Sequence, residues 1–217
     1  ESLHQDLLKL EMQLSKPVIL LGGGGHASVV VEILRLNKVE IIGVSDLSQQ
    51  DKIIFEDIPV LDDDEIITKY KTNKVRLVNG IGPSTKSFNR QIINAKFIEL
   101  GYEFLSAVHP SAIISKSAIL EDGCQIMAGV IIQSRSTIGK NSVINTGATI
   151  DHDASIGEYC HVAPGAVICG SVFTGSNVFI GAGATVIENL SLGDKSLVAA
   201  GTTLRRNLLT EERYLGS

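Results

Sequence analysis

The chain has 217 residues, enough for one large domain or two small ones. Its formal net charge of −5 at pH 7 gives no general attraction to nucleic acid, so no nucleic-acid partner is expected. No apolar run reaches the roughly 18 residues that span a bilayer, no signal peptide is visible, and the three cysteines lack metal-type spacing, so we expect a cytoplasmic protein.

The first 16 residues predict a lead-in helix or linker. Apolar side chains recur at helical spacing in LHQDLLKLEMQL (residues 3–14), and Pro17 ends the pattern. We therefore divide the chain into this lead-in (residues 1–16), a first domain (17–106) and a second domain (107–217).

The first domain begins with a strand, a glycine-rich turn and a helix, in PVILLGGGGHASVVVEILRLN. Gly22, Gly24 and Ala27 fit the G-x-G-x-x-G/A pattern, in which a helix N-terminus binds a diphosphate. The alternative is that the glycines only permit tight packing of strand on helix. The candidate substrate-binding residues of this turn are Gly23, Gly24, Gly25 and His26.

Two more strands are predicted in this domain. VEIIGVSD ends at Asp46, about the expected distance from the glycine turn for an acid that reads a ribose. KVRLVNGIG leaves Asn79 and Gly80 at its carboxyl end, where ligands of open α/β sheets bind. Asp46, Asn79 and Gly80 are therefore further candidates for substrate binding.

Two more helices alternate with these strands. Residues 62–64 are all Asp and predict the N-terminus of a helix that runs to Tyr70. Ser84 or Thr85 begins another helix that stops near Gly101. The domain therefore reads as half of a doubly wound, Rossmann-like α/β fold.

A six-residue repeat organises the second domain. Seventeen positions spaced six apart, from Val108 to Leu204, are aliphatic except for Thr174. A period of six fits neither an α-helix nor a simple strand alternation, but it fits a very short strand and a turn, repeated. The pattern is that of the hexapeptide-repeat left-handed parallel β-helix, in which three hexads make one coil and residues 18 apart stack.

The stretch ATIDHDASIGEYCHVAPGA (residues 148–166) carries the candidate base. His152 follows the core position Ile150 by two residues, which points it outward from the prism. A carboxylate at one ring nitrogen fixes the tautomer and raises the basicity of an imidazole. Asp153 is our choice for that partner and Asp151 is the alternative, because spacing alone does not separate them. Gly170 lies 18 residues after His152, so its amide should lie one coil above as an oxyanion donor.

The combination of GGGGHA with a β-helix that carries DHD resembles one family over about Val18 to Tyr214. It is similar to the bacterial sugar O- and N-acetyltransferases of sialic-acid and bacillosamine biosynthesis. The resemblance implies a nucleotide sugar on the first domain, a homotrimer of β-helices, and acetyl-CoA between neighbouring prisms. Some relatives carry this unit behind a membrane-bound sugar-phosphate transferase, so fusion to or association with such a partner is also implied.

The resemblance also implies site residues. The catalytic His–Glu pair of the family falls on His152–Asp153, where the shorter Asp is a departure. A second histidine near the acetyl group falls on His161, and an Asn beside the base falls on Asn145. A glycine whose amide faces the thioester falls on Gly170. An alternative for His161 is a buried or interface histidine without a role in catalysis.

Coenzyme A requires a groove lined by backbone and cations for its phosphates. The segment FIGAGATVIENLSLGDKSLVAAGTTLRRN supplies small residues for close approach and basic side chains, although the small residues also suit turns. The candidate cofactor-binding residues are His161, Gly170, Gly181, Ala182, Ala200, Gly201 and Arg206.

We therefore predict an acetyl-CoA-dependent N-acetyltransferase of a nucleotide-activated sugar, with no metal. By resemblance, UDP-4-amino-4,6-dideoxy-N-acetylglucosamine is the first acceptor to try, for bacterial glycan biosynthesis such as protein glycosylation. O-acetylation of sialic acid or a related sugar is the alternative. A dinucleotide-binding sensor without catalysis and a β-helix zinc carbonic anhydrase are rivals from other classes, but His109, His152 and His161 lack the spacing of that zinc site.

Overall fold

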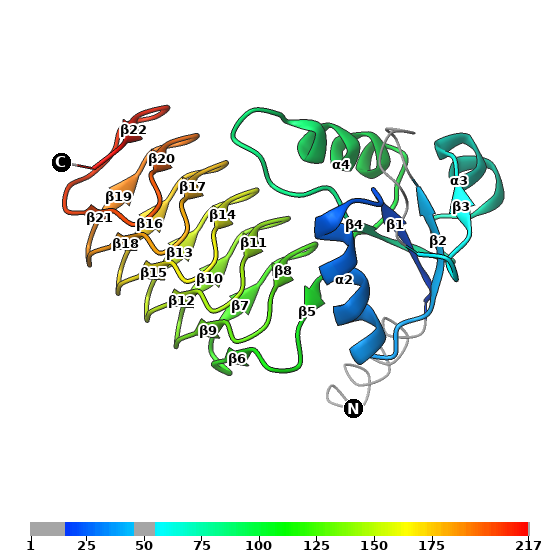
Figure 1. The fold of residues 1–217 in the computed structure, drawn as a ribbon, viewed down its shortest axis with the longest axis horizontal. Helices are drawn as coiled ribbons and strands as arrows, with labels where there is room; N and C mark the ends of the chain where they lie inside the picture. Colours follow the sequence, from blue (N-terminus) through cyan, green and yellow to red (C-terminus); the bar gives the residue numbers. More distant parts are fainter. Residues whose placement is uncertain (1–15, 46–54, 217) are drawn as a thin grey trace. The chain divides into compact units, whose positions relative to one another are not determined.

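The computed structural model describes residues 16–45 and 55–216, which form two compact units that meet in sequence between Leu105 and Ser106 (Figure 1). The helix expected over residues 3–14 lies outside the described residues, and so does Asp46.

The described part of the first unit contains one parallel sheet of four strands, in the order β3-β2-β1-β4. Its strands are β1 (Val18–Leu21), β2 (Ile41–Ser45), β3 (Val60–Leu61) and β4 (Arg76–Asn79). The four residues of β1 are fully buried, as expected for a central parallel strand with both faces covered. The short strand β3 is not part of the sequence prediction, because two residues carry no periodic signal.

In the described part of this unit, three helices accompany the sheet: α2 (Gly25–Leu36), α3 (Asp63–Lys69) and α4 (Asn89–Glu99). Helix α3 begins as predicted, because the Asp62 carboxylate accepts from the N–H of Glu65 and the Glu65 side chain accepts from the N–H of Asp62. Helix α4 begins later than the predicted Ser84 or Thr85. The Ser84 and Ser87 hydroxyls each accept from a backbone N–H two residues on, which favours turns over helix.

Over residues 106–216, the second unit is a left-handed parallel β-helix of two-residue strands in three sheets (Figure 1). Face 1 consists of β5 (Ala107–Val108), β8 (Gln125–Ile126), β11 (Val143–Ile144), β14 (His161–Val162), β17 (Phe179–Ile180), β20 (Leu197–Val198) and β22 (Arg213–Tyr214). Face 2 consists of β6 (Ile113–Ile114), β9 (Ile131–Ile132), β12 (Thr149–Ile150), β15 (Val167–Ile168), β18 (Thr185–Val186) and β21 (Thr203–Leu204). Face 3 consists of β7 (Ile119–Leu120), β10 (Thr137–Ile138), β13 (Ser155–Ile156), β16 (Phe173–Thr174) and β19 (Ser191–Leu192).

The second residue of each two-residue strand forms the core of the prism. From Ile126 to Leu204 this column of positions six apart is buried throughout, so one continuous apolar rod runs along the unit. Residues 18 apart pair across parallel strands, such as Ile138 with Ile156 and Ile150 with Ile168. Burial of each aliphatic side chain stabilises the fold by roughly 1.5–3 kcal/mol, and the repeat adds that contribution at every step.

Thr174, the exception in the aliphatic column, is fully buried. Its hydroxyl takes the place of a backbone acceptor in the hydrogen-bond ladder of face 3. In the neighbouring coil the N–H of Gly139 donates to the carbonyl of Ile156, 2.7 Å away. The equivalent N–H of Gly157 donates instead to the Thr174 hydroxyl, at 3.0 Å. The hydroxyl therefore supplies the acceptor that the carbonyl supplies elsewhere on face 3.

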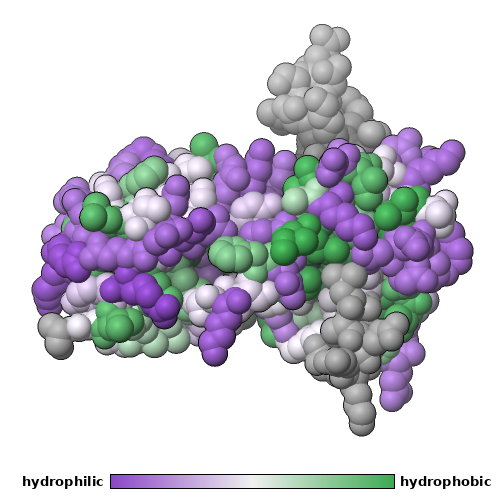
Figure 2. Space-filling model, turned by 90° about the horizontal axis from the view of Figure 1, so that it is seen from above, coloured by the Kyte–Doolittle hydropathy of each residue, from purple (hydrophilic) through white to green (hydrophobic). Residues whose placement is uncertain are grey.

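Hydrophilic and hydrophobic side chains are interspersed over the surface of the β-helix seen in Figure 2. Among the residues that the structure describes, no helix is both long enough and apolar enough to cross a membrane.

Replacing Thr174 by Val tests the role of its hydroxyl. Valine restores the aliphatic pattern of the column, yet it leaves the Gly157 N–H without its acceptor, so we expect the free energy of unfolding to fall by about 1–3 kcal/mol. Thr174→Ser keeps the hydroxyl and should retain most of the stability. Chemical denaturation at one protein concentration measures both variants, and a Thr174→Val protein as stable as the wild type would contradict the assignment.

Candidate active site

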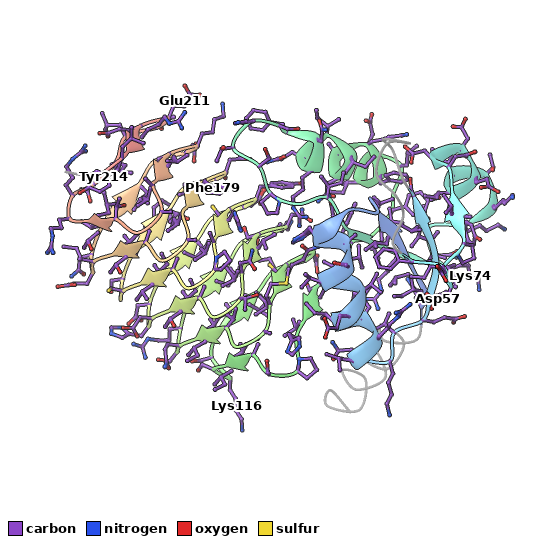
Figure 3. All side chains as sticks on the ribbon, viewed as in Figure 1. Asp57, Lys74, Lys116, Phe179, Glu211 and Tyr214 are labelled. Carbon is purple, nitrogen blue, oxygen red and sulfur yellow. The ribbon has the colours of Figure 1, made fainter. Side chains whose placement is uncertain are left out.

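The turns that lead from face 2 to face 3, named here the 2–3 corner, carry the candidate base. Each turn contributes two outward positions, and those of successive coils stack in two columns. The first column contains Lys116, Ser134, His152, Gly170, Glu188 and Arg206. Lys116, at one end of this column, points away from the ribbon in Figure 3. His152 lies in the turn between β12 and β13, and its side chain is 53% exposed.

The imidazole of His152 is held by the acid that follows it. Nδ1 of His152 lies 2.7 Å from Oδ2 of Asp153. The Asp151 carboxylate instead binds the backbone: its Oδ1 accepts from the N–H of His152 at 2.7 Å. Of the two acids that the sequence left open, Asp153 is therefore the one that contacts the ring, and the shorter Asp side chain reaches it. A carboxylate acceptor at Nδ1 favours the tautomer in which Nε2 carries a lone pair.

Arg135 is a residue of this cluster that the sequence analysis missed. Its Nε donates to Oδ1 of Asp153 at 2.6 Å, and its Nη2 donates to Oδ2 at 2.7 Å. The signal was present in the sequence, because Arg135 stands 18 residues before Asp153 and a coil has that length. Both residues adopt a positive φ of 60°, so equivalent turns project their side chains from neighbouring coils.

This pairing perturbs the acid strongly. The Arg135 guanidinium, followed by the His152 imidazole, lowers the pKa of the Asp153 carboxyl to about 2 from the usual 3.8. Asp153 is therefore ionised at any pH where the protein is expected to work, and it stays available as an acceptor for the ring.

Gly170 lies against the His152 ring, one coil further along the prism. A Cβ at Gly170 would lie 2.8 Å from Cε1 and 2.9 Å from Nε2 of His152, so only glycine leaves room for the imidazole. The neighbouring N–H of Ser171 donates to the carbonyl of His152 at 2.9 Å, which fixes the register of the two turns. The repeat thus places the Gly170 backbone beside the ring, as the 18-residue spacing predicts.

His161 and Asn145 lie at a different part of the prism. His161 belongs to β14 on face 1, where its Nε2 lies 3.3 Å from the Asn145 amide nitrogen and its ring packs edge-on against Phe179. Phe179 marks this face in Figure 3. Nine residues separate His161 from His152, which is half a coil, so within one chain the two histidines point to different sides. The structure therefore groups Asn145 with His161 and not with His152.

The turns that lead from face 1 to face 2, named here the 1–2 corner, form a column of glycines. Its members are Gly129, Gly147, Gly165, Gly183 and Gly201, with φ between 63° and 69°. The 2–3 corner adopts the same backbone with Arg135, Asp153, Ser171 and Asn189, so the conformation alone does not demand glycine. A Cβ at Gly147, Gly165, Gly183 or Gly201 would meet nothing within 4 Å. The outer surface of this corner is therefore bare backbone at the glycines, which stand beside the exposed Thr146, Pro164, Ala182 and Ala200.

Two of the predicted cofactor-binding residues, Gly181 and Arg206, do not form part of this bare surface. Gly181 is pressed against the next coil, because a Cβ there would lie 2.4 Å from the backbone nitrogen of Ala200. Arg206 lies in the first column of the 2–3 corner, pairs with Glu212 at 2.7 Å and lies over the ring of Tyr214. Its charge is therefore already offset within the chain.

The glycine-rich turn of the first unit leads directly into helix α2. Helix α2 begins after Gly24, which caps it without a side-chain hydrogen bond, and a Cβ at Gly25 would meet nothing within 4 Å. Gly23 and His26 flank this helix start, with His26 in its first turn. The space beside Gly25 is therefore open, and phosphate binding by Gly23, Gly24 and Gly25 stays a prediction.

The turn after β4 is packed closely against the glycine turn. A Cβ at Gly80 would lie 2.6 Å from the carbonyl oxygen of Gly22, so glycine is needed for this approach. The Asn79 side chain is buried: its amide nitrogen donates to Asn94 and to the carbonyl of Arg90, and its oxygen accepts from the N–H of Ile81. Of the two predicted residues, Asn79 therefore stabilises the turn after β4 through the hydrogen bonds of its buried side chain.

Two other chemistries, a cysteine nucleophile and a metal centre, have different requirements. Burial raises the pKa of the Cys124 thiol to about 12 and that of Cys160 to about 11, so neither is a thiolate nucleophile at neutral pH. Among the described residues, no group of three His, Cys, Asp or Glu side chains is placed to hold a metal ion. His109 is engaged separately, with Nδ1 3.0 Å from the N–H of Ser111.

Known protein families match both units. The family described as PglD N-terminal domain matches residues 17–93. The family described as bacterial transferase hexapeptide (six repeats) matches residues 117–152 and 135–170, and the hexapeptide repeat of succinyl-transferase matches residues 172–206. No curated protein sequence matches the chain.

Solved structures match over nearly the whole chain. A histidine-to-asparagine mutant of perosamine N-acetyltransferase from Caulobacter crescentus, in complex with CoA and GDP-perosamine, is 34% identical with a TM-score of 0.85, and the match covers 93% of this chain and 94% of that one. The acetyltransferase domain of PglB from Neisseria gonorrhoeae FA1090, in complex with acetyl coenzyme A, is 24% identical with a TM-score of 0.79 and coverages of 89% and 93%. WeeI from Acinetobacter baumannii AYE is 20% identical with a TM-score of 0.82 and coverages of 93% and 97%. The last two likenesses concern the fold alone.

The low pKa of Asp153 predicts how this cluster responds to acid. A carboxyl whose pKa is depressed in the folded state stabilises the fold above its unfolded pKa of 3.8, and loses that contribution as the pH falls through about 2. Carbon-13 NMR of the Asp153 carboxyl should therefore give a midpoint near 2. In Arg135→Gln, which removes the largest cause of the shift, the midpoint should rise. A wild-type midpoint near 3.8 would rule out the ion pair in solution.

Proposed function

The chain belongs to the bacterial hexapeptide-repeat acetyltransferases of nucleotide-activated sugars, and we propose that it transfers an acetyl group from acetyl-CoA to an amino group of such a sugar. The observation that carries this proposal is the His152–Asp153 pair lying against the Gly170 backbone, in a chain 34% identical to a perosamine N-acetyltransferase. Imidazole, ionised acid and a bare backbone amide are the parts that direct acyl transfer requires.

The reaction proceeds by direct attack of the amine on the thioester. The acceptor nitrogen forms a bond to the acetyl carbonyl carbon while Nε2 of His152 takes a proton from that nitrogen. Asp153 accepts from Nδ1 and stabilises the imidazolium that forms. The carbonyl oxygen carries the negative charge of the tetrahedral intermediate and faces the Gly170 N–H. Collapse breaks the carbon–sulfur bond, and the departing thiolate of coenzyme A takes the proton from His152.

The bare backbone of the 1–2 corner supports a coenzyme groove at that corner. A pantetheine chain can lie against glycine turns because no Cβ stands in its way, and Gly183 and Gly201 leave open space outside them. In this proposal Ala182, Ala200 and Gly201 line the groove. Arg206 would meet a coenzyme phosphate only by leaving Glu212.

The separation of the two histidines supports an oligomeric site. One chain directs His152 and the Asn145–His161 pair to different sides of its prism. Neighbouring prisms in a homotrimer can bring the 2–3 corner of one subunit opposite the 1–2 corner of the next, so that one thioester meets both sets. We propose this trimer, and light scattering should give about three times the chain mass of 23.2 kDa.

The acceptor proposed first is UDP-4-amino-4,6-dideoxy-N-acetylglucosamine, made for cytoplasmic steps of bacterial glycan biosynthesis. The helix α2 N-terminus and the adjacent glycine turn would hold the diphosphate. The relative with 34% identity was solved with GDP-perosamine, which makes GDP-linked amino sugars the second candidate. O-acetylation of a sialic acid remains the alternative chemistry, since the same base can deprotonate a hydroxyl.

Substitution of His152 tests the assigned base. His152→Ala should lower the rate of thiol release from acetyl-CoA about 10²- to 10⁴-fold, because it removes general-base assistance, while coenzyme binding and oligomeric state stay unchanged. The matched control is His109→Ala, a histidine of the same prism engaged with Ser111. Unchanged turnover in His152→Ala would refute the base.

A panel of acceptors tests the substrate class. Free thiol release from acetyl-CoA is followed with UDP-, GDP- and CMP-sugars that carry either an amine or only hydroxyls. We expect turnover with an amino sugar linked to UDP or GDP and none with its hydroxyl analogue. Turnover with a CMP-linked sialic acid alone would select O-acetylation.

A further inference from the structure

We propose that Arg135 is a positioning residue of this acetyltransferase, which acts by holding the Asp153 carboxylate in the orientation that meets His152. The inference rests on the proposed function and concerns a residue one coil away from the base. Arg135 touches Asp153 and not the imidazole, so its effect on the reaction passes through the acid.

The guanidinium determines which way the carboxylate faces. Arg135 binds both oxygens of Asp153 at once, at 2.6 and 2.7 Å, which fixes the plane of the carboxylate as well as its position. Oδ2 is shared between Arg135 Nη2 and His152 Nδ1, each at 2.7 Å. The orientation that satisfies the guanidinium is therefore the one that presents an oxygen to the ring.

The backbone of both partners is fixed by the same stacking. The N–H of Arg135 donates to the Ser117 hydroxyl at 3.1 Å, and the N–H of Asp153 donates to the carbonyl of Ser134 at 3.0 Å. Each residue thus sits in a turn that is tied to the coil before it. The two side chains meet because equivalent turns of neighbouring coils stack directly over each other. This stacking fixes the position of the Asp153 carboxylate relative to the β-helix.

A contribution to folding does not by itself explain this pair. The Arg135 side chain is 64% exposed and that of Asp153 is 35% exposed, and ion pairs in such surroundings contribute little to stability. Orientation has a larger effect on the reaction, because a misplacement of about 1 Å in a catalytic group can lower the rate roughly a hundredfold. The same contact can therefore contribute little to the free energy of unfolding and much to kcat.

Five variants test this role through the split between kcat and KM. Arg135→Gln should lower kcat about tenfold and leave KM for acetyl-CoA and for the amino sugar unchanged. Arg135→Lys, which keeps the charge but lacks the planar fork, should fall between Gln and the wild type. In Asp153→Asn, which already lacks the ionised acceptor, adding Arg135→Gln should have no further effect. The matched control is Arg35→Gln, which removes another exposed Arg–Asp contact, that of Arg35 with Asp57, and should leave kcat unchanged.

Three kinetic outcomes would overturn the proposal. Unchanged kcat in Arg135→Gln would show that Asp153 needs no holding. A rise in KM at unchanged kcat would assign Arg135 to ligand binding. An equal loss of kcat with and without Asp153 would show that Arg135 acts by another route.

A readout that needs no turnover separates this inference from the proposed function. Nitrogen-15 NMR of His152 should show one tautomer, protonated at Nδ1, in the wild type, and a mixture in Arg135→Gln. If no acceptor in the panel is acetylated but this tautomer change is seen, the positioning stands and the assigned reaction falls. If the tautomer is the same in both proteins, the positioning falls whatever the activity.

Discussion

The stacking of 18-residue coils is the constraint on which the rest of the second unit depends. From Ile126 to Leu204 the coils bury one column of side chains, all aliphatic except Thr174, and a slip of one residue would turn that set outward. The register of the core therefore also fixes the register of the surface. Residues 18 apart, such as Arg135 and Asp153 or His152 and Gly170, become neighbours without any interaction of their own having to bring them together.

The site follows from that constraint with few additions. The 2–3 corner supplies a guanidinium, an acid, an imidazole and a glycine from three successive turns, and the backbone of each turn is tied to the previous coil. The 1–2 corner repeats the same backbone angle with glycine only, which leaves those positions bare. Two corners with one backbone geometry thus differ through their side chains alone, and we propose that one carries the base and the other a surface for an extended cofactor.

Much of this arrangement can be read from the sequence because burial has a period. The aliphatic column predicts the prism, and its length of 18 residues per coil predicts the contact of Gly170 with His152. Asp153 was the predicted partner of His152, but spacing alone did not separate it from Asp151, since the contact depends on the left-handed turn that aims Asp153 at the ring. The contact of Arg135 with Asp153 follows the same 18-residue spacing, but the sequence analysis missed it. The late start of α4 and the strand β3 depend on local hydrogen bonds and pairing that leave no periodic trace.

The central claim is that the stacked turns present His152 and Gly170 together to one thioester. The most direct measurement is a crystal structure of the protein with coenzyme A and an amino-sugar nucleotide. We predict that the acceptor nitrogen lies within hydrogen-bonding distance of Nε2 of His152, with the Gly170 N–H facing the position of the acetyl oxygen. A sulfur atom and an acceptor nitrogen bound away from the 2–3 corner, with His152 facing solvent, would contradict the account.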